Sequence, residues 1–444
     1  TCGIMIGKNE NSLITISLCG DIFISKRLPG SSYPGFDELY TFLHKHECRF
    51  ANLETTIHKR EGYPEAFPGG GYAMADPACL CDLKRMGLNI FNTANNHAMD
   101  YGHNGLLATI KYLTDLELPF AGTGRNLAEA SKPAFFETSN GRIALLGVTS
   151  SFHDSYAAGP QNQDMQGRPG VAPLKHQAVY ELSENHYKAL LEVSRSIGIN
   201  SYHEQAIKEG YLPRCENLKF GIYEFRKGVE NRVHTSPNEK DLQRTIAAIA
   251  DAKRQSDIVI LSVHSHQFAD GSKKNPPEFI KIFVRKCIDA GATIVVCHGP
   301  HVVRGIEVYN SGVIFYGLGN FIFQHEDVDY LPEEFYWKYG KTREQVTGVS
   351  EIMNNRSKNN TIGLCTQPDA WRSVMVSISC DLEYLEVRLF PIKIILEGRK
   401  GLKGLPVLTS DLSIIQEIKN LSIEFGTNIE MANANFGYIR ISRI

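Results

Sequence analysis

Short apolar runs alternate with amphipathic stretches along most of this chain. The runs are rich in β-branched residues and end in polar side chains, which is typical of buried strands in an α/β sheet. Strands of this kind are predicted at 13–18, 49–54, 89–94, 142–148, 257–262, 292–296 and 312–316. Helical spacing is found at 36–44, 76–86, 104–116 and 278–290. This order predicts an α/β fold in which neighbouring strands run parallel.

The region between the fourth and fifth predicted strands departs from this alternation. A long helical stretch, interrupted near Pro213 and Pro237, is predicted over about 176–253. We expect it to form a helical insertion in a larger domain.

The C-terminal third has a different pattern. Residues 326–339 are acidic and aromatic without a clean period, which predicts a lid, a partner surface or a solvated loop. Alternating runs at 373–380 and 384–390 predict a C-terminal β-hairpin, and a helix is expected over 411–425. We therefore expect a main domain over 10–325, which residues 326–444 complete with a lid, a hairpin and a helix.

Polar side chains stand at the C-terminal ends of six predicted strands. The helix at 278–290 joins two of these strands in a βαβ unit, so both strands should present their carboxyl ends at one sheet edge, where ligands of open α/β sheets bind. Each side chain alone could be structural, but together they predict one common site. The set is Asp21, Asn52 with Glu54, Asn96 with His97, His264 with His266, His298 with His301, and Asn320.

This set of side chains predicts a metal centre. Carboxylate oxygens and imidazole nitrogens without thiolates suit Mn, Fe or Zn. Two carboxylates and several histidines are enough for two divalent ions, which about 3.5–4 Å apart can hold a hydroxide and orient an anionic group. A histidine of the set could instead protonate a leaving group or clamp a substrate.

Composition narrows the class of protein. The 444 residues carry a net charge of -2 and are 42% hydrophobic, as in ordinary soluble globular proteins. No basic stripe indicates nucleic-acid binding, and no apolar run approaches the ~20 residues of a transmembrane helix. Neither a phosphate loop nor a dinucleotide fingerprint is present, so an ATP-driven ligase is poorly supported. Ten irregularly spaced cysteines favour free thiols, and hence a cytoplasmic chain or the trimmed form of an extracytoplasmic one.

An ordered set of short motifs runs through residues 13–323. They are Gly20-Asp21, Asn52-Leu53-Glu54, Ala94-Asn95-Asn96-His97 with Asp100-Tyr101-Gly102, Arg168-Pro169-Gly170-Val171, His298-Gly299-Pro300-His301-Val302 and Leu318-Gly319-Asn320-Phe321. This set resembles the CapA family of bacterial capsule synthesis, also called the PgsA family of poly-γ-glutamate biosynthesis proteins. That family is similar to calcineurin-like metallophosphoesterases.

The resemblance implies a four-layer αββα metallophosphoesterase-like sandwich with a dinuclear metal site. It implies that the metal ligands are Asp21, Glu54, His264, His298 and His301, with Glu54 in the place of the bridging carboxylate. Asn96 and His97 match the family's Asn-His pair, and we expect both to act in catalysis together with His266. Two positions depart from the pattern. Phe23 stands where phosphoesterases have a histidine, and His266 is an extra imidazole where the family usually has His-Trp-Gly.

Two functions follow as expectations. The first is a metal-dependent hydrolase that acts through a metal-activated water on an anionic substrate, either a γ-glutamyl-type amide or a phosphoester. Predicted substrate-binding residues are Asn52, Asp100, Arg168, Arg304 and Asn320. The two arginines are candidate clamps because a guanidinium pairs with carboxylate or phosphate bidentately, although they could instead fix surface loops. The second is a non-catalytic accessory protein that binds a poly-γ-glutamate-like polymer during capsule biosynthesis or export.

Overall fold

The computed structural model describes residues 13–30, 33–381, 383–432 and 436–443. The predicted domain start at residue 10 lies outside them. The chain divides into two compact units. The second unit consists of Leu174–Leu242 and Pro277–Phe283, and the first contains Gln243–Pro276 and the described residues before Leu174 and after Phe283.

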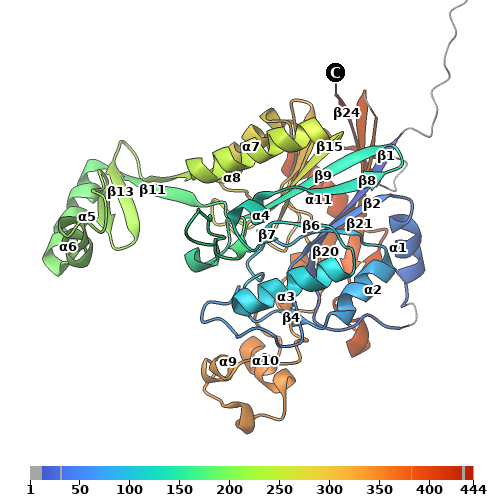
Figure 1. Cartoon of the computed structure of the whole chain (residues 1–444), viewed down its shortest axis with the longest axis horizontal. Helices are drawn as coiled ribbons and strands as arrows, with labels where there is room; N and C mark the ends of the chain where they lie inside the picture. Colours follow the sequence, from blue (N-terminus) through green and yellow to red (C-terminus); the bar gives the residue numbers. More distant parts are fainter. Residues whose placement is uncertain (1–12, 31–32, 382, 433–435, 444) are drawn as a thin grey trace, which may run out of the picture. The chain divides into compact units, whose positions relative to one another are not determined.

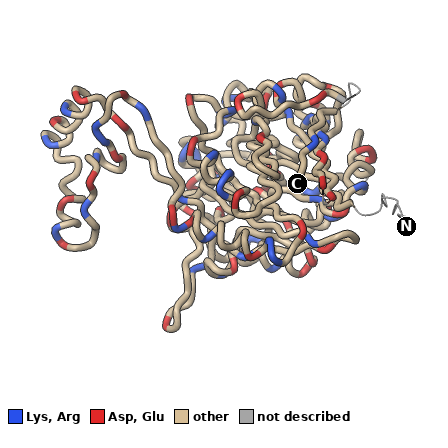
Figure 2. Tube along the Cα trace, turned by 90° about the horizontal axis from the view of Figure 1, so that it is seen from above, with Lys and Arg blue, Asp and Glu red and all other residues tan. Residues whose placement is uncertain are grey.

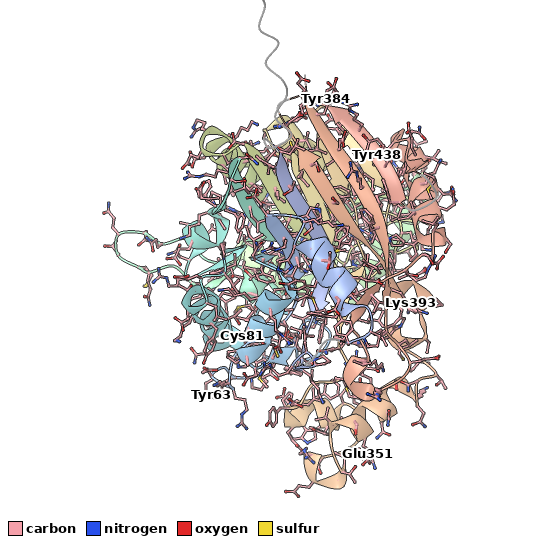
Figure 3. All side chains as sticks on the ribbon, turned by 90° about the vertical axis from the view of Figure 1, so that its right-hand side faces the viewer. Tyr63, Cys81, Glu351, Tyr384, Lys393 and Tyr438 are labelled. Atoms are coloured by element: carbon pink, nitrogen blue, oxygen red, sulfur yellow. The ribbon has the colours of Figure 1, made fainter. Side chains whose placement is uncertain are left out.

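A ten-stranded mixed sheet forms one half of the first unit. Its order is β23-β24-β21-β20-β1-β2-β5-β6, with β19 on β1 and β22 on β21. The predicted hairpin is confirmed as β20 and β21, and Tyr384 and Tyr438 mark β21 and β24 in Figure 3. The strands are β1 (Ile14–Phe23), β2 (Cys48–Leu53), β5 (Ile90–Asn92), β6 (Phe120–Ala121), β19 (Asn320–Phe323), β20 (Arg372–Cys380), β21 (Tyr384–Ile394), β22 (Pro406–Leu408), β23 (Glu430–Ala432) and β24 (Phe436–Ser442).

A six-stranded sheet with the order β17-β18-β16-β15-β9-β8 forms the other half. Strands β9, β15, β16 and β18 run parallel, and the predicted βαβ unit is confirmed because β15 and β16 are parallel neighbours. The strands are β8 (Ala134–Thr138), β9 (Gly141–Thr149), β15 (Ile258–His264), β16 (Ile294–His298), β17 (Ile306–Tyr309) and β18 (Gly312–Phe315). Two short pairs, β3 (Thr56–Ile57) with β4 (Met74–Ala75) and β7 (Thr123–Gly124) with β10 (Gly170–Val171), lie outside both sheets.

The two sheets share one hydrophobic core. Successive residues of a strand point to opposite faces of its sheet, so every second residue of a strand faces the other sheet. Ile16 and Leu18 of β1 pack in the same buried cluster as Ile258 and Ile260 of β15. The intervening Val259 is also completely buried and points the other way, away from that cluster. The sheets are therefore stacked face to face.

Helices cover the outer faces of the stacked sheets. Leu39 of α1 (Phe36–Leu43) and Leu80 of α2 (Ala78–Met86) belong to the core beneath the ten-stranded sheet. In Figure 1, α2 and α3 (Gly102–Asp115) lie on one side of the strands, whereas α7 (Glu239–Gln255) and α8 (Glu278–Asp289) run alongside β15 on the other. The expected αββα layering is thus confirmed. Two further helices of this unit are α4 (Leu127–Ser131) and α11 (Ser413–Ser422).

The second unit corrects the prediction of a purely helical insertion. Helices α5 (Glu184–Ile197) and α6 (Ser201–Lys208) are present, but a four-stranded sheet with the order β12-β13-β11-β14 accompanies them. Its strands are mostly half-exposed, so they lack the apolar runs that predict buried strands. They are β11 (His176–Leu182), β12 (Leu218–Phe220), β13 (Tyr223–Lys227) and β14 (Arg232–Pro237).

Residues 326–366, which we call the α9–α10 segment, belong to the first unit. They contain α9 (Glu333–Trp337) and α10 (Val349–Ser357), and Glu351 marks α10 in Figure 3. Phe335 and Met353 are buried in one cluster with Tyr72 of the same unit. The alternative of a solvated loop is therefore wrong for this segment.

Charges of both signs are interspersed along the described chain (Figure 2). No large area of one sign stands out in that view of the described residues. Every helix that the structure describes is too short or too polar to cross a lipid bilayer.

Candidate metal centre

Four polar residues lie in register across neighbouring parallel strands of the ten-stranded sheet. Asp21 pairs with Asn320 on one side and with Asn52 on the other, and Asn52 pairs with Asn92. Asn52 is two positions beyond Phe50, which belongs to the core between the sheets. The row therefore faces the six-stranded sheet at the carboxyl ends of its strands.

A bulge in β1 gives Asp21 this orientation. Leu18 and Asp21 are three positions apart, but their partners on β2 are only two apart, so β1 carries one extra residue. Without it, Asp21 would point away from Leu18 and out of the space between the sheets. Gly20 fits here because a Cβ would lie 1.9 Å from the Gly319 oxygen. That same oxygen accepts a 3.0 Å hydrogen bond from the Asp21 N–H.

Two histidines face this row from the six-stranded sheet. His264 ends β15 and His298 ends β16, and the two residues are register partners. Ile260 of β15 and Val296 of β16 belong to the core between the sheets. His264 is four positions beyond Ile260, and His298 is two positions beyond Val296. Residues an even number of positions apart in a strand point to the same face, so both imidazoles point into the space between the sheets. The strands include these histidines, whereas the apolar runs alone predict strand ends two residues earlier.

The Asp21 carboxylate is hydrogen-bonded on both oxygens. It accepts from Asn52 Nδ2 at 2.8 Å and from the Gly299 N–H at 3.1 Å, and His298 Nδ1 is 3.3 Å away. Burial by itself raises the pKa of Asp21. Hydrogen bonding and charge from His298, with the charges of His264 and His301, outweigh burial and lower the pKa below its usual value. Asp21 is therefore ionised and held in place.

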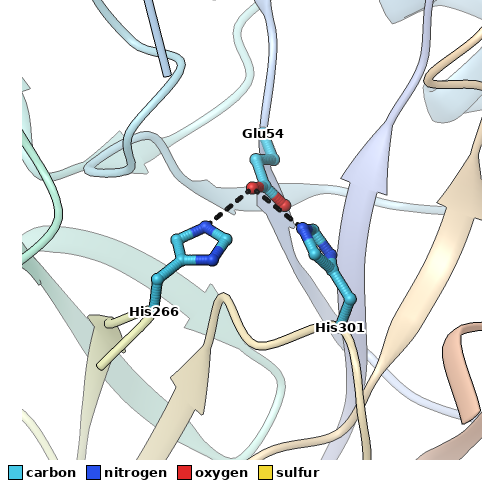
Figure 4. A group of neighbouring side chains, drawn as sticks. All are labelled: Glu54, His266 and His301. Carbon is cyan, nitrogen blue, oxygen red and sulfur yellow. Dashed lines mark ion pairs between the residues drawn. The ribbon is translucent and has the colours of Figure 1, made fainter. Parts of the chain in front are cut away.

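The Glu54 carboxylate has very different surroundings. It is fully buried, and neither oxygen has a hydrogen-bond partner in the described chain. Its Oε1 lies 3.6 Å from His264 Nε2, 3.7 Å from His266 Nε2 and 3.9 Å from His301 Nε2, beyond hydrogen-bond range. Figure 4 shows two of these imidazoles directed at the carboxylate. Burial, with the charges of Asp21 and Asp100, raises the Glu54 pKa well above its usual value.

Burial disfavours the charged form of three of the imidazoles around Glu54. Burial lowers the pKa of His264 to about 3 and that of His266 well below its usual value. Burial also lowers the pKa of His301, whose Nδ1 contacts Asn320 Oδ1 at 2.8 Å. His301 has a φ of 60°, an uncommon left-handed conformation for a residue other than glycine. Nδ1 is thus occupied by Asn320, and Nε2 faces Glu54.

These residues fit a metal ion. One group, Glu54, His266 and His301, and a second, Asp21, Glu54 and His264, each bring three possible ligand atoms within 4.8 Å of one another. A buried carboxylate without hydrogen bonds, with imidazole nitrogens around it, is costly unless a cation binds there. Glu54 belongs to both groups, as the bridging position implied by the resemblance requires. The roles of these five residues and His298 as ligands remain predictions.

A pocket of about 200 Å³ leads to this centre. Asn96, His97, His266 and His301 line it, so all three residues expected to act in catalysis are in one place. Asn96 Nδ2 donates to the Gly69 carbonyl at 2.6 Å, and its Oδ1 has no hydrogen-bond partner among the described residues.

Asp100 positions His97 and does not line this pocket. Its Oδ2 lies 2.6 Å from His97 Nδ1, and its oxygens accept the N–H groups of Gly69 at 2.8 Å and Ala73 at 2.7 Å. Because Nδ1 is occupied, Nε2 is the His97 nitrogen that remains for other groups. The ring of Phe23 packs edge-on against His97 with the centroids 5.0 Å apart. An aromatic contact thus occupies the position where phosphoesterases have a histidine.

The two arginines predicted as clamps lie outside this arrangement. Arg168 is exposed and donates from Nε to the Ala157 carbonyl at 3.0 Å. Arg304 is 1% exposed and donates to the carbonyls of Lys273 at 2.7 Å and Gln267 at 3.0 Å. Neither guanidinium lines the pocket. Asn52 and Asn320 are buried beside the candidate ligands. Asn52 contacts Asp21 and His264, and Asn320 contacts His301.

Sequence reasoning missed several residues of the site. Asn92 Nδ2 donates to Asn52 Oδ1 at 2.7 Å and completes the polar row. Its place at the end of an apolar strand was a usable signal, as for Asn52. The pocket also includes Lys273, His325 and Arg356, which come from loops and from α10 and carry no local pattern.

Stacked mixed sheets between helices, with carboxylates and histidines at the carboxyl ends of their strands, define a metallophosphoesterase-like α/β protein. The chain belongs to the family described as bacterial capsule synthesis protein PGA_cap, which it matches over residues 15–325. The resemblance to the CapA family is thereby confirmed.

Relatives of this chain include capsule biosynthesis proteins. It is 31% identical over 440 residues to an uncharacterized protein, y4sH, of Sinorhizobium fredii, covering 96% of this chain and 93% of the relative. It is 26% identical to the PGA biosynthesis protein CapA of Bacillus subtilis, covering 71% of this chain and 64% of that protein. A probable polyglutamine synthesis accessory protein of Mycobacterium tuberculosis is 23% identical, with 62% of this chain and 56% of the relative covered.

Proposed function

We propose that this protein is a metal-dependent hydrolase that acts on an anionic substrate, a γ-glutamyl-type amide or a phosphoester. One observation carries the proposal. The Glu54 carboxylate is fully buried without a hydrogen bond, and three histidine nitrogens face it at 3.6–3.9 Å. A purely structural glutamate in such a place would be paired or replaced by an apolar residue, since an unpaired buried charge is strongly destabilising.

We propose two divalent ions, Mn, Fe or Zn, because the donors are oxygens and imidazoles. Asp21, Glu54, His264, His266, His298 and His301 would hold them. When bound, such ions polarise a substrate oxygen and lower the pKa of a coordinated water towards neutrality.

The chain's own residues then orient the substrate and move the proton. His97 lines the pocket, and Asp100 fixes its Nδ1, so Nε2 is directed to act as an acid towards a leaving group. Asn96 lines the same pocket and offers a buried, unpaired Oδ1 to a substrate N–H or O–H group. Phe23 packs on His97 and helps to exclude water from this side.

Metal analysis and turnover measurements test the proposal together. Protein purified with Mn, Fe or Zn should contain stoichiometric metal and should cleave an aryl phosphate or a γ-glutamyl peptide. The variant H301N should lose metal and turnover, whereas Glu307→Gln is a control because Glu307 is buried but paired with Arg285 and Tyr316. Absence of bound metal together with absence of turnover of both substrate classes would contradict the proposal.

A second function is favoured by the names of the relatives. A non-catalytic accessory protein would bind a poly-γ-glutamate-like polymer during capsule biosynthesis or export. Polymer binding should then survive the variants H298A and H301A, since these histidines lie in the metal centre and polymer recognition would not depend on it. If those variants abolish both metal content and polymer binding, a purely accessory role is contradicted.

A further inference from the structure

The pocket beside the metal centre has a second half that the hydrolase mechanism does not use. Its far wall comes from the α9–α10 segment, which contributes Leu331, Phe335, Met353 and Arg356. The family match ends at residue 325, so this wall lies outside the matched region. The match to the family model therefore implies nothing about what this wall selects.

The charged residues that line the pocket are all basic. Arg356 and Lys273 line it, and none of the described residues that line it is acidic. Arg356 is half-buried and has no carboxylate partner within ion-pair distance in the described residues. A guanidinium in this position is a ready partner for a carboxylate or phosphate group.

The path from Arg356 to the metal centre is short. His325 stacks on Phe323 with ring centroids 4.2 Å apart, and Phe323 in turn packs on His301 at 5.3 Å. Arg356, His325 and His301 line the same pocket. Both ends of a small molecule could therefore reach Arg356 and the centre.

The loop that carries Lys273 is fixed by hydrogen bonds from the buried Arg304. Arg304 donates hydrogen bonds to the carbonyls of Lys273 and Gln267, and Lys273 Nζ is 3.3 Å from Gln367 Oε1. The buried Arg304 thus positions the second cation of the pocket without entering it. A loop fixed in this way can present a charge without a large loss of conformational entropy on binding.

The walls and the size of the pocket limit the substrate further. Phe335, Met353 and Leu331 add apolar side chains to the lining of the pocket. The volume of about 200 Å³ lies below the ~300–1,000 Å³ of pockets that enclose drug-sized ligands. The interior thus suits a small molecule or the end of a chain.

We propose that Arg356 is a specificity-determining residue that binds the anionic group of a small amphipathic substrate, whose apolar part lies against Phe335 and Met353. Carboxylate and phosphate share the chemistry that Arg356 recognises. The position of this substrate next to the centre rests on the proposed hydrolase function. Binding itself does not, and it is measured separately.

Calorimetric titration with three ligands of similar shape tests this proposal. The probes are 3-phenylpropanoate, phenyl phosphate and the neutral 3-phenylpropanamide, with propanoate as the probe that lacks the apolar part. Wild-type protein should bind an aromatic anion more tightly than both the amide and propanoate. The tighter of the two aromatic anions identifies the group as carboxylate or phosphate.

Substitution of the arginine supplies the decisive comparison. R356Q should weaken binding of the preferred aromatic anion by about tenfold or more, because hydrogen bonds to charged groups contribute more than neutral ones. It should leave affinity for the amide unchanged, and R356K should retain part of the anion affinity. R343Q is the matched control because Arg343 lies in the same segment, is exposed and does not line the pocket.

Two results would overturn the inference. One is equal anion affinity in R356Q and wild type while thermal unfolding shows both proteins to be folded. The other is wild-type affinity for the amide as high as for both anions. Arg356-dependent binding by a protein that holds no metal and turns over neither substrate class would instead overturn the hydrolase and leave this inference intact.

Discussion

Asp21 and Glu54 are two buried carboxylates at the ends of neighbouring strands, and they are stabilised in different ways. Asp21 accepts hydrogen bonds from Asn52 and from the Gly299 N–H, and its pKa is lowered. Glu54 has no hydrogen bond from the described residues, and its pKa is raised. The described residues thus provide hydrogen bonds for the Asp21 carboxylate but none for the Glu54 carboxylate. If the proposed metal binds, Glu54 is the residue whose charge it compensates.

The largest expected effect is a loss of metal affinity when the Glu54 carboxylate is removed. Glu54→Gln should lower metal affinity by about a hundredfold or more, because a charged ligand common to both donor groups is lost. Metal analysis after dialysis against a buffered metal checks this. Glu307→Gln should keep its metal. An E54Q variant with full metal content would contradict the inference that Glu54 is the carboxylate that needs a cation.

A smaller effect is expected at the histidine that lies between the two carboxylates. His301 has Nδ1 3.7 Å from Asp21 Oδ2 and Nε2 3.9 Å from Glu54 Oε1, and Asn320 holds its Nδ1. Asn320→Ala should lower metal affinity by about tenfold, since groups that orient a ligand are typically worth 10–100-fold. A competition titration with a chelating dye measures it. An unchanged affinity would mean that backbone alone orients the ring.

The pH dependence of stability should have opposite signs at the two carboxylates. In metal-free protein the Glu54 pKa is raised, so its contribution to stability is present below about 4.5 and is lost as pH rises through the folded-state value. Asp21 has a lowered pKa, so its contribution is present above about 3.8 and is lost as pH falls.

Glu54→Gln isolates the first of these contributions. The free energy of unfolding of E54Q minus that of wild type, both without metal, should increase between pH 5 and pH 8. The expected gain is about 1.4 kcal/mol for each unit by which the Glu54 pKa is raised within that range. Urea unfolding at several pH values measures the difference, and restoring metal to the wild type should remove it. A pH-independent difference would show that Glu54 is not the unsatisfied group.

The smallest effect is expected away from both carboxylates. Arg168 is exposed and bonds a loop carbonyl, so Arg168→Gln should change metal content and turnover by less than about twofold. Steady-state kinetics on the best substrate found for the wild type checks this. A loss of tenfold or more in kcat/KM would restore Arg168 as a substrate clamp.

The main layers could be predicted because buried strands and amphipathic helices leave strong periodic signals. Strands such as 292–296 and the hairpin at 373–390 were recognisable from apolar runs alone. The half-exposed strands of the second unit have no such runs, and the sequence pattern there predicted a helix. The extra residue in β1 could not be predicted either, because a bulge is defined by the pairing of β1 with the neighbouring strand β2.

The site was predictable where polar residues end apolar strands. That signal brought Asp21, Asn52, His264 and His298 together from four separate strands. It did not indicate which of the two carboxylates, Asp21 or Glu54, is left without hydrogen bonds from the described residues. That depends on donors from Gly299 and from Asn52 on another strand, which only the folded chain brings to Asp21. Arg356 is beyond such reasoning, since only the folding of the α9–α10 segment brings it to the pocket.

The left-handed backbone at His301 has a consequence for how this centre could decay in evolution. At a φ of 60°, asparagine, aspartate and glycine are tolerated far better than alanine or a β-branched residue. A descendant that no longer needed the imidazole would therefore drift to one of those three residues. Asparagine or glycine at this position in a relative would mark a lost ligand, whereas aspartate could preserve one.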